Sequence, residues 1–312
     1  MEYILLIIGF ILLIKGADFF VDGASSVAGK LKVPSLIIGL TVVSMGTSLP
    51  EAAVSVSASL SGDNAISLGN VIGSNIFNLL MVVGISAIIA PIVSDRDVLK
   101  RDMPVNIAIT AALFVMLLDG NLSRLDAVIL LVLFAGYMCL LFKSAMKNRE
   151  EGENPKVYSW LKSIIYIVVG MAAIIGGGQL VVNSAKTIAA TLGMGDTLIG
   201  LTVVAIGTSL PELVTSIVAA RKGESGIAMG NAVGSCIFNV LFILGLAGVI
   251  KPMTADDAFF IDTGILIGVS ALMLLFAFTK KKTGRLEGAV CVLIYGAYTA
   301  YIIMRAFHIW IF

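Results

Sequence analysis

The chain has 312 residues, of which 58% are apolar and only 13% are charged. Soluble domains carry about 25% charged residues, so this chain lacks the polar surface of a soluble enzyme. Its net charge of +1 also gives no sign of the basic face that binds nucleic acid. The composition indicates a polytopic membrane protein. Three scattered cysteines, Cys139, Cys236 and Cys291, predict neither a disulfide framework nor a metal site.

Ten apolar stretches are long enough to cross a bilayer, which takes about 20 residues each. No basic region precedes the first stretch, so we interpret it as a span rather than a cleaved signal. The longest polar connection, residues 143–159, leaves no room for a folded domain. The expected spans cover approximately residues 3–27, 34–60, 64–90, 103–119, 124–143, 160–190, 196–220, 225–250, 258–279 and 286–306.

Lysine and arginine are concentrated in alternate connections between these spans. If the N-terminus lies outside, the inner loops carry 16 of these residues and the outer side carries 4. Basic residues favour the cytoplasmic side of a membrane. We therefore expect a multi-pass protein of the cell membrane with both termini outside.

Spans 2 and 7 contain two copies of one sequence. Residues 39–55 (GLTVVSMGTSLPEAAVS) and residues 200–216 (GLTVVAIGTSLPELVTS) match at 12 of 17 positions, at an offset of 161. In spans 3 and 8, residues 69–78 (GNVIGSNIFN) and residues 230–239 (GNAVGSCIFN) match at 7 of 10 positions at the same offset. A constant offset means that the two halves of the chain align without gaps.

The two copies begin five spans apart, and because five is odd the second copy enters the membrane from the opposite side. Inverted repeats of this kind are typical of secondary transporters, whose substrate site lies near the midplane where the copies meet. We expect an all-α membrane protein of ten transmembrane helices in two inverted five-helix repeats. The first half is residues 1–150 and the second is residues 151–312.

The string GTSLPE interrupts span 2 at residues 46–51 and span 7 at residues 207–212. Proline removes a helical hydrogen bond, and Ser-x-x-Glu is also the signature of a capped helix start. One interpretation is therefore that Glu51 and Glu212 are only helix caps. However, irregular backbone at this depth occurs where it is buried or lines a cavity, and an intramembrane glutamate costs roughly 2.5 kcal/mol or more. We expect both glutamates to line an ion site.

Spans 3 and 8 each carry three polar residues at i, i+4 and i+8, which lie on one stripe of a helix. These side chains can join neighbouring helices or form the polar wall of a cavity, and the two interpretations are compatible. The residues are Asn70, Ser74 and Asn78 in span 3, and Asn231, Ser235 and Asn239 in span 8.

Every candidate ligand in these motifs is a hard oxygen, and no histidine or cysteine pair accompanies them, so zinc and copper are poor candidates. Ca²⁺ takes about six to eight oxygens, of which Glu51 and Glu212 can supply up to four, and one Ca²⁺ would neutralise both charges. The hydroxyls and carbonyls of the Gly-Thr-Ser segments suit Na⁺. Mg²⁺ fits less well, because it demands a stricter octahedron.

The paired GTSLPE and GSxIFN motifs resemble the two alpha repeats of the sodium/calcium exchanger family, within the calcium/cation antiporter group. The resemblance extends over nearly the whole chain. It implies an antiporter rather than an enzyme, which exchanges Na⁺ for Ca²⁺ by alternating access and has no cofactor. Its partners would be these two ions and the lipid bilayer, with no nucleic acid and no obligate protein partner. Spans 1 and 6 would slide as a gate on Gly9, Gly16, Gly170 and Gly176 to Gly178.

The resemblance also implies a cluster of ion sites between spans 2, 3, 7 and 8. Ca²⁺ would be held by Glu51 and Glu212 with the backbone carbonyls of Thr47 and Thr208. One Na⁺ site would use Ser44 (carbonyl), Thr47, Ser48 and Ser74. Its mirror image would use Ala205 (carbonyl), Thr208, Ser209 and Ser235. Asn78 and Asn239 would lie beside the glutamates.

Two departures from the wider family are informative. Some relatives, including potassium-dependent ones, have an aspartate where Asn239 stands, and because the asparagine removes a charge it argues against a K⁺ requirement. The long cytoplasmic regulatory domain of animal exchangers has no counterpart between Lys143 and Ser159, so the chain resembles a prokaryotic exchanger in a plasma membrane.

Two alternatives to Na⁺/Ca²⁺ exchange stay open. The first is H⁺/Ca²⁺ antiport, in which the glutamates take protons in the return step. Relatives of that type usually show Gly-Asn followed by a glutamate where this chain has GTSLPE. The second is a channel or an intramembrane enzyme, and exchange differs from conduction in its need for a counter-ion gradient.

Overall fold

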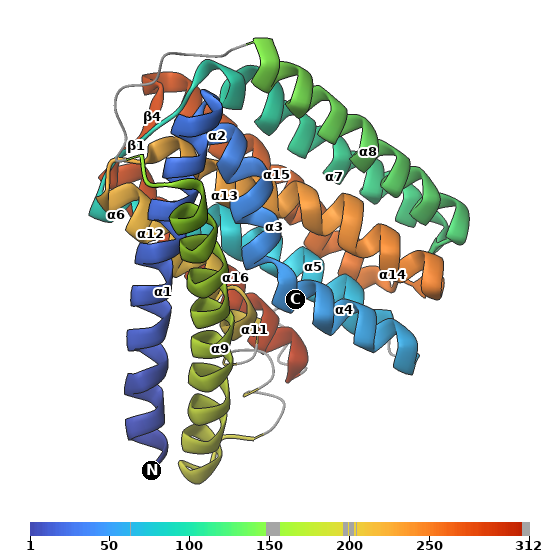
Figure 1. Cartoon of the computed structure of the whole chain (residues 1–312). Helices are drawn as coiled ribbons and strands as arrows, with labels where there is room; N and C mark the ends of the chain where they lie inside the picture. Colours follow the sequence, from blue (N-terminus) through green and yellow to red (C-terminus); the bar gives the residue numbers. More distant parts are fainter. Residues whose placement is uncertain (63, 148–156, 196–198, 200–202, 204, 308–312) are drawn as a thin grey trace.

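The computed structural model describes the whole chain except residues 63, 148–156, 196–198, 200–202, 204 and 308–312. The described part is a bundle of helices joined by short connections (Figure 1). Eight of its helices are long and apolar enough to cross a membrane, and a ninth span is a bent helix pair. Span 7 of the ten expected spans, residues 196–220, is described continuously only from Ala205. The chain is therefore a multi-pass membrane protein.

Helices α1 (Glu2–Leu31) and α9 (Trp160–Thr191) lie side by side and extend together away from the other helices (Figure 1). Their backbones are in direct contact, because glycines face each other along the interface. A Cβ atom added to Gly16 would lie 2.9 Å from the carbonyl oxygen of Gly170, and one added to Gly170 would lie 2.6 Å from the backbone nitrogen of Phe20. Small residues allow this close approach of membrane helices.

The second span is broken where the sequence predicts a break. It consists of α2 (Ser35–Ile38), a π-helical segment η1 (Gly39–Val43), α3 (Ser44–Thr47) and α4 (Leu49–Ser61). The axis bends by 48° at Ser48. Pro50 lies in the first turn of α4, where a helix does not need its missing N–H group.

The second GTSLPE string folds in the same way. Helix α11 (Ala205–Thr208) ends one residue before Ser209, and α12 (Leu210–Arg221) begins one residue after it. Pro211 again lies in the first turn of the helix that follows the break. Each string therefore ends one short helix and begins another.

Two interrupted helices form the centre of the bundle. The first is α5 (Asn64–Phe77), η2 (Asn78–Val82) and α6 (Val83–Ile89), and the second is α13 (Ser225–Phe238), η6 (Asn239–Leu244) and α14 (Gly245–Ile250). In the most apolar 18-residue stretch of each, 72% and 78% of the residues are buried, against at most 39% for the other unbroken spans. Both π-helical segments begin at an asparagine that the sequence singles out, and such segments frequently mark functional sites.

The remaining helices pack around this centre. They are α7 (Met103–Met116) and α8 (Arg124–Lys147), with the short segments η3 (Val98–Asp102) before α7 and η4 (Leu117–Asp119) after it, followed by α15 (Asp257–Lys280) and α16 (Arg285–Ala306). Helix α7 contacts α15, α8 contacts α14, and α16 contacts α6.

In the described part of the chain, four two-residue strands link the connections between helices in two pairs. Strand β1 (Ile92–Val93) pairs with β4 (Lys282–Thr283), and β2 (Asn121–Leu122) pairs with β3 (Met253–Thr254), both antiparallel. Moving β1 and β2 by 161 residues gives β3 and β4, so the two pairs are counterparts of each other. The sequence does not predict them, because two residues are too few for a strand pattern.

One cluster of charges joins α1 to the loop between α12 and α13. Lys222 lies 2.6 Å from a carboxylate oxygen of Asp22 and 3.4 Å from one of Asp18. Ser25 donates a hydrogen bond to Glu224 in the same loop. These contacts attach one part of α1 to the rest of the bundle.

Candidate functional site

Glu51 and Glu212 lie in the first turns of α4 and α12, and both are completely buried. The serine at each helix break crosses to the glutamate of the other repeat. Ser48 Oγ donates to Glu212 Oε1 at 2.8 Å, and Ser209 Oγ donates to Glu51 Oε1 at 2.9 Å. Neither serine makes a side-chain cap hydrogen bond. The two breaks therefore face each other, and the two serines do not cap their own helices.

Asn70 connects the two helices that follow the first break. Its Nδ2 donates to the backbone carbonyl of Glu51 at 3.2 Å and to Ser55 Oγ at 2.9 Å. This is the joining role that the polar stripe predicts as one of its two interpretations.

Asn231 repeats this arrangement in the second half. Its Nδ2 donates to the backbone carbonyl of Glu212 at 3.2 Å and to Ser216 Oγ at 2.9 Å. It also accepts a hydrogen bond from Thr47 Oγ1 at 3.0 Å. Ser55 and Ser216 were not singled out from the sequence, although their matched place at the end of the 39–55 and 200–216 repeat was a usable signal.

Hydroxyl groups extend this network around the glutamates. Ser209 Oγ also lies 3.2 Å from Ser74 Oγ, which brings the stripe of α5 to the second break. The carbonyl of Ser44 accepts from Ser235 Oγ at 3.4 Å and lies 3.3 Å from Thr47 Oγ1. The network thus joins both breaks to both stripes.

Two further residues of the predicted ion cluster, Ala205 and Thr208, are the first and last residues of α11. Thr208 lies directly before Ser209, whose side chain reaches Glu51. Thr208 also lines a cavity between α4, α9 and α12, together with Pro50, Gly178 and Pro211. The second break therefore opens onto this cavity.

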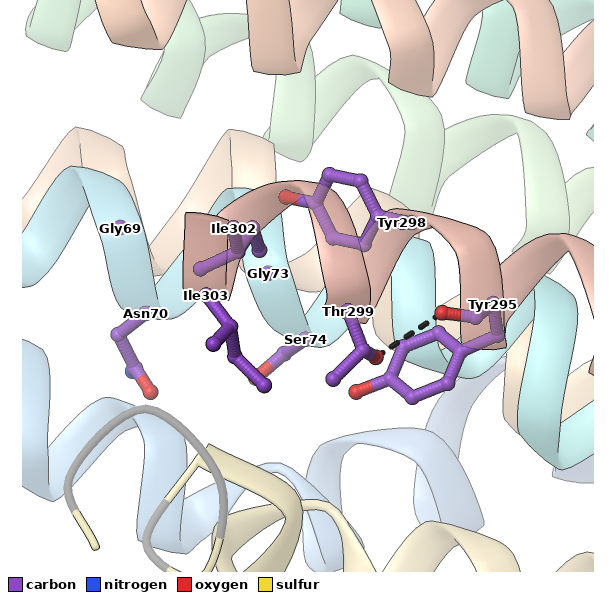
Figure 2. Close-up of a pocket in the computed structure, with 9 residues that line it drawn as sticks. All are labelled: Gly69, Asn70, Gly73, Ser74, Tyr295, Tyr298, Thr299, Ile302 and Ile303. Atoms are coloured by element: carbon purple, nitrogen blue, oxygen red, sulfur yellow. Dashed lines mark hydrogen bonds between the residues drawn. The ribbon is translucent and has the colours of Figure 1, made fainter. Parts of the chain in front are cut away.

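A further cavity lies between α5 and α16 (Figure 2). Figure 2 shows Asn70 and Ser74 on α5 opposite Tyr295, Tyr298 and Thr299 on α16. Because Ser74 also binds Ser209, this cavity adjoins the hydroxyl network around the glutamates.

The buried polar atoms that have no hydrogen-bond partner among the described residues include four oxygens of the predicted ion cluster: Glu51 Oε2, Glu212 Oε2, Asn78 Oδ1 and Asn239 Oδ1. They form two pairs related by the offset of 161. The segment that begins with Asn78 packs on the helix of Glu212, and the segment that begins with Asn239 packs on the helix of Glu51. Buried polar atoms are nearly always bonded, and burying an unpaired carboxylate is costly. A desolvated cation with oxygen ligands would satisfy this arrangement.

The donor set differs from that of a transition-metal centre. Within the described part of the chain, no group of three or more histidine, cysteine, aspartate or glutamate side chains gathers in one place. Two carboxylates, amide oxygens and hydroxyls are instead ligands that suit Ca²⁺ and Na⁺.

One buried polar residue at the centre was missed from the sequence. Asn75 of α5 is completely buried and binds both Asn239 and the backbone carbonyl of Cys236. Its position in the second repeat is occupied by Cys236, so comparing the repeats gives no signal for it.

Comparisons with known proteins agree with this geometry. A family model described as sodium/calcium exchanger protein matches residues 1–143 and 162–304. The chain is 35% identical to the sodium/calcium exchanger MaX1 of Methanosarcina acetivorans, over 95% of this chain and 97% of the relative. It is 36% identical to the inner membrane protein YrbG of Escherichia coli, over 96% and 95%. A structure of the sodium-calcium exchanger NCX_Mj soaked with zero Na⁺ and Ca²⁺ matches with a TM-score of 0.84 at 35% identity, covering 96% of this chain and 98% of the other. The exchangers among these proteins are transporters rather than enzymes.

Proposed function

The chain belongs to the sodium/calcium exchanger protein family, a family of antiporters, and from this premise we propose that it exchanges Na⁺ for Ca²⁺ across the membrane by alternating access. Ca²⁺ and Na⁺ are its substrates, and it uses no cofactor.

The observation that carries the proposal is the set of four buried oxygens without partners, from Glu51, Glu212, Asn78 and Asn239. Two carboxylates neutralise one Ca²⁺, and the amide oxygens add neutral ligands, as this cation prefers. The backbone carbonyls of Thr47 and Thr208 would complete its coordination. Without the cation, the free carboxylate oxygens would face a site with no compensating positive charge.

We assign the hydroxyl network to Na⁺. One Na⁺ site uses the carbonyl of Ser44 with Thr47, Ser48 and Ser74, and its mirror image uses the carbonyl of Ala205 with Thr208, Ser209 and Ser235. Ser48 and Ser209 already donate to the two glutamates. A cation on one of these hydroxyls would therefore change the environment of the Ca²⁺ ligands, which supports competition between the two ions.

Alternating access would arise from ten helices in two inverted halves, residues 1–150 and 151–312. The matched bonds of Asn70 and Asn231 and the matched strand pairs support this symmetry. Helices α1 and α9 would slide over the core as the gate. Their glycine contacts allow the two helix backbones to pack closely against each other. The ion pairs of Lys222 with Asp18 and Asp22 would be among the contacts that the motion changes.

The distribution of basic residues supports both termini on the outer side of a prokaryotic plasma membrane. The asparagine at position 239 supports exchange without K⁺, because it leaves the site with two carboxylates rather than three.

The test is the accumulation of ⁴⁵Ca²⁺ by purified protein in liposomes, with Na⁺, K⁺ or H⁺ gradients imposed separately. The proposal predicts uptake only when the liposomes contain Na⁺ and the outside does not, and no uptake in protein-free liposomes. Uptake driven by a proton gradient would replace this function with H⁺/Ca²⁺ antiport. Uptake that needs no counter-ion would indicate a channel.

A further inference from the structure

The side chain of Asn75 connects the two central helices. Its Nδ2 donates to the backbone carbonyl of Cys236 at 3.0 Å, and its Oδ1 accepts from Nδ2 of Asn239 at 3.0 Å. Both asparagines are completely buried. The two hydrogen bonds link the backbone carbonyl of Cys236, through Asn75, to the side chain of Asn239, which carries one of the four unpartnered oxygens.

The direction of this chain follows from its first member. A backbone carbonyl can only accept a hydrogen bond, so Asn75 must turn its NH₂ group toward Cys236. Its Oδ1 then faces Asn239 and can be satisfied only by a donor, which is the NH₂ group of that residue. Asn239 Oδ1 is consequently directed elsewhere, and it is buried without a partner among the described residues.

The second repeat has no asparagine at the position equivalent to Asn75. Cys236 occupies the position equivalent to Asn75, and its thiol lies 3.7 Å from the backbone carbonyl of Asn75. A thiol cannot hold a carboxamide in one orientation as a second carboxamide can. Neither the Oδ1 nor the Nδ2 of Asn78, the counterpart of Asn239, has a partner in the described part of the chain.

We propose that Asn75 is a positioning residue that fixes Asn239 with its oxygen toward the transported cation and thereby makes the two halves of the ion site unequal. The inference rests on the proposed function, since it assumes a cation at the centre. Asn239 is then a pre-oriented ligand, whereas Asn78 can turn either its oxygen or its NH₂ group to the site.

The primary test compares Asn75→Ala and Asn75→Cys with wild type in Ca²⁺ binding and in Na⁺-driven ⁴⁵Ca²⁺ uptake. Removing a residue that orients a metal ligand typically costs 10- to 100-fold in affinity. We expect the half-saturating Ca²⁺ concentration to rise by about 10- to 100-fold, with a smaller change in maximal rate. Cys236→Ala keeps the backbone carbonyl and serves as the matched control, with wild-type affinity expected.

Two double variants separate positioning from packing. If Asn75 acts through Asn239, Asn75→Ala adds no further loss of affinity to Asn239→Ala. In Asn75→Cys with Cys236→Asn, the new asparagine can hold Asn78 from the mirror-related side, so affinity should recover relative to Asn75→Cys alone.

Wild-type affinity in Asn75→Ala, or full additivity with Asn239→Ala, would overturn the inference while leaving the proposed function intact. A wild-type protein that neither binds Ca²⁺ nor exchanges it for Na⁺ would instead overturn the proposed function. If Asn75→Ala does not fold, Asn75→Cys and the exchanged double variant give the same comparison, since cysteine already occupies the equivalent position in the other half.

Discussion

The hydroxyl of Ser209 lies 2.9 Å from a carboxylate oxygen of Glu51, which precedes it by 158 residues. The reciprocal bond joins Ser48 to Glu212 at 2.8 Å. Each half of the chain therefore holds the acidic residue of the other half. This exchange brings the two helix breaks together and gives each carboxylate a hydroxyl partner from the other half.

We expect Ser48→Ala and Ser209→Ala to weaken Na⁺ binding to similar extents. Each change removes a hydroxyl that is bonded to a glutamate and that is assigned to a Na⁺ site. A hydrogen bond to a charged group contributes about 1.5–3 kcal/mol. The Na⁺ concentration that half-inhibits ⁴⁵Ca²⁺ uptake should therefore rise roughly 10- to 100-fold.

Ser59→Ala is the matched control for these variants, because Ser59 is buried and bonded to Ser67 rather than to a glutamate. It should leave Na⁺ inhibition unchanged. Wild-type Na⁺ inhibition in both Ser48→Ala and Ser209→Ala would remove these hydroxyls from the Na⁺ sites.

Asn231→Ala should destabilise the protein more than Asn70→Ala. Both side chains join two helices through their Nδ2 group, but Asn231 also accepts a bond from Thr47 and is fully buried. Losing a partner of a buried polar group costs about 1–3 kcal/mol. Thermal unfolding in detergent measures the difference, with the exposed Asn121→Ala as the control. An equal loss of thermal stability in the two variants would mean that the hydrogen bond from Thr47 to Asn231 does not contribute as expected.

Gly170→Ala should destabilise the contact between α1 and α9, because its Cβ atom would lie 2.6 Å from the backbone of Phe20. Overpacking of this kind costs about 1–3 kcal/mol. Gly264→Ala, on α15, is the control, since a Cβ atom there meets nothing within 4 Å among the described residues. Thermal unfolding and the transport rate should both separate the two variants. Identical behaviour would mean that the two helices do not pack as described.

Asn239→Asp should change both the affinity for Ca²⁺ and the response to K⁺. The variant adds a third carboxylate to the site and removes the amide that binds Asn75. An added charge favours an additional monovalent cation, so ⁴⁵Ca²⁺ uptake should become sensitive to K⁺ while wild type is not. Asn121→Asp adds the same charge at an exposed position. If Asn239→Asp keeps wild-type affinity and K⁺ independence, Asn239 does not lie beside the ions.

The helix breaks and the position of a glutamate beside each break could be predicted from the sequence. A proline in an apolar span is a local pattern, and the string GTSLPE recurs unchanged in the second half. The pairing of Ser48 with Glu212 could not be predicted. The local Ser-x-x-Glu pattern favours a cap within one helix, whereas the observed bond depends on how two breaks pack together.

Asn75 illustrates a second limit of the sequence. Comparison of the repeats finds residues that are the same in both halves, and Asn75 matters because its counterpart, Cys236, is different. The strand pairs were missed for another reason, since a two-residue bridge such as Ile92–Val93 has no periodicity. The start of span 7 could not be compared, because most of residues 196–204 lie outside the described part of the chain.

The central claim is that Glu51 and Glu212 hold Ca²⁺ together, and direct binding of ⁴⁵Ca²⁺ to purified Glu51→Gln and Glu212→Gln tests it. Each variant keeps the size of the side chain and removes one charge, while Glu224→Gln makes the same change in the loop before α13. We predict saturable, Na⁺-displaceable binding in wild type and Glu224→Gln, and its loss in both site variants. Wild-type binding in either Glu51→Gln or Glu212→Gln would contradict the account.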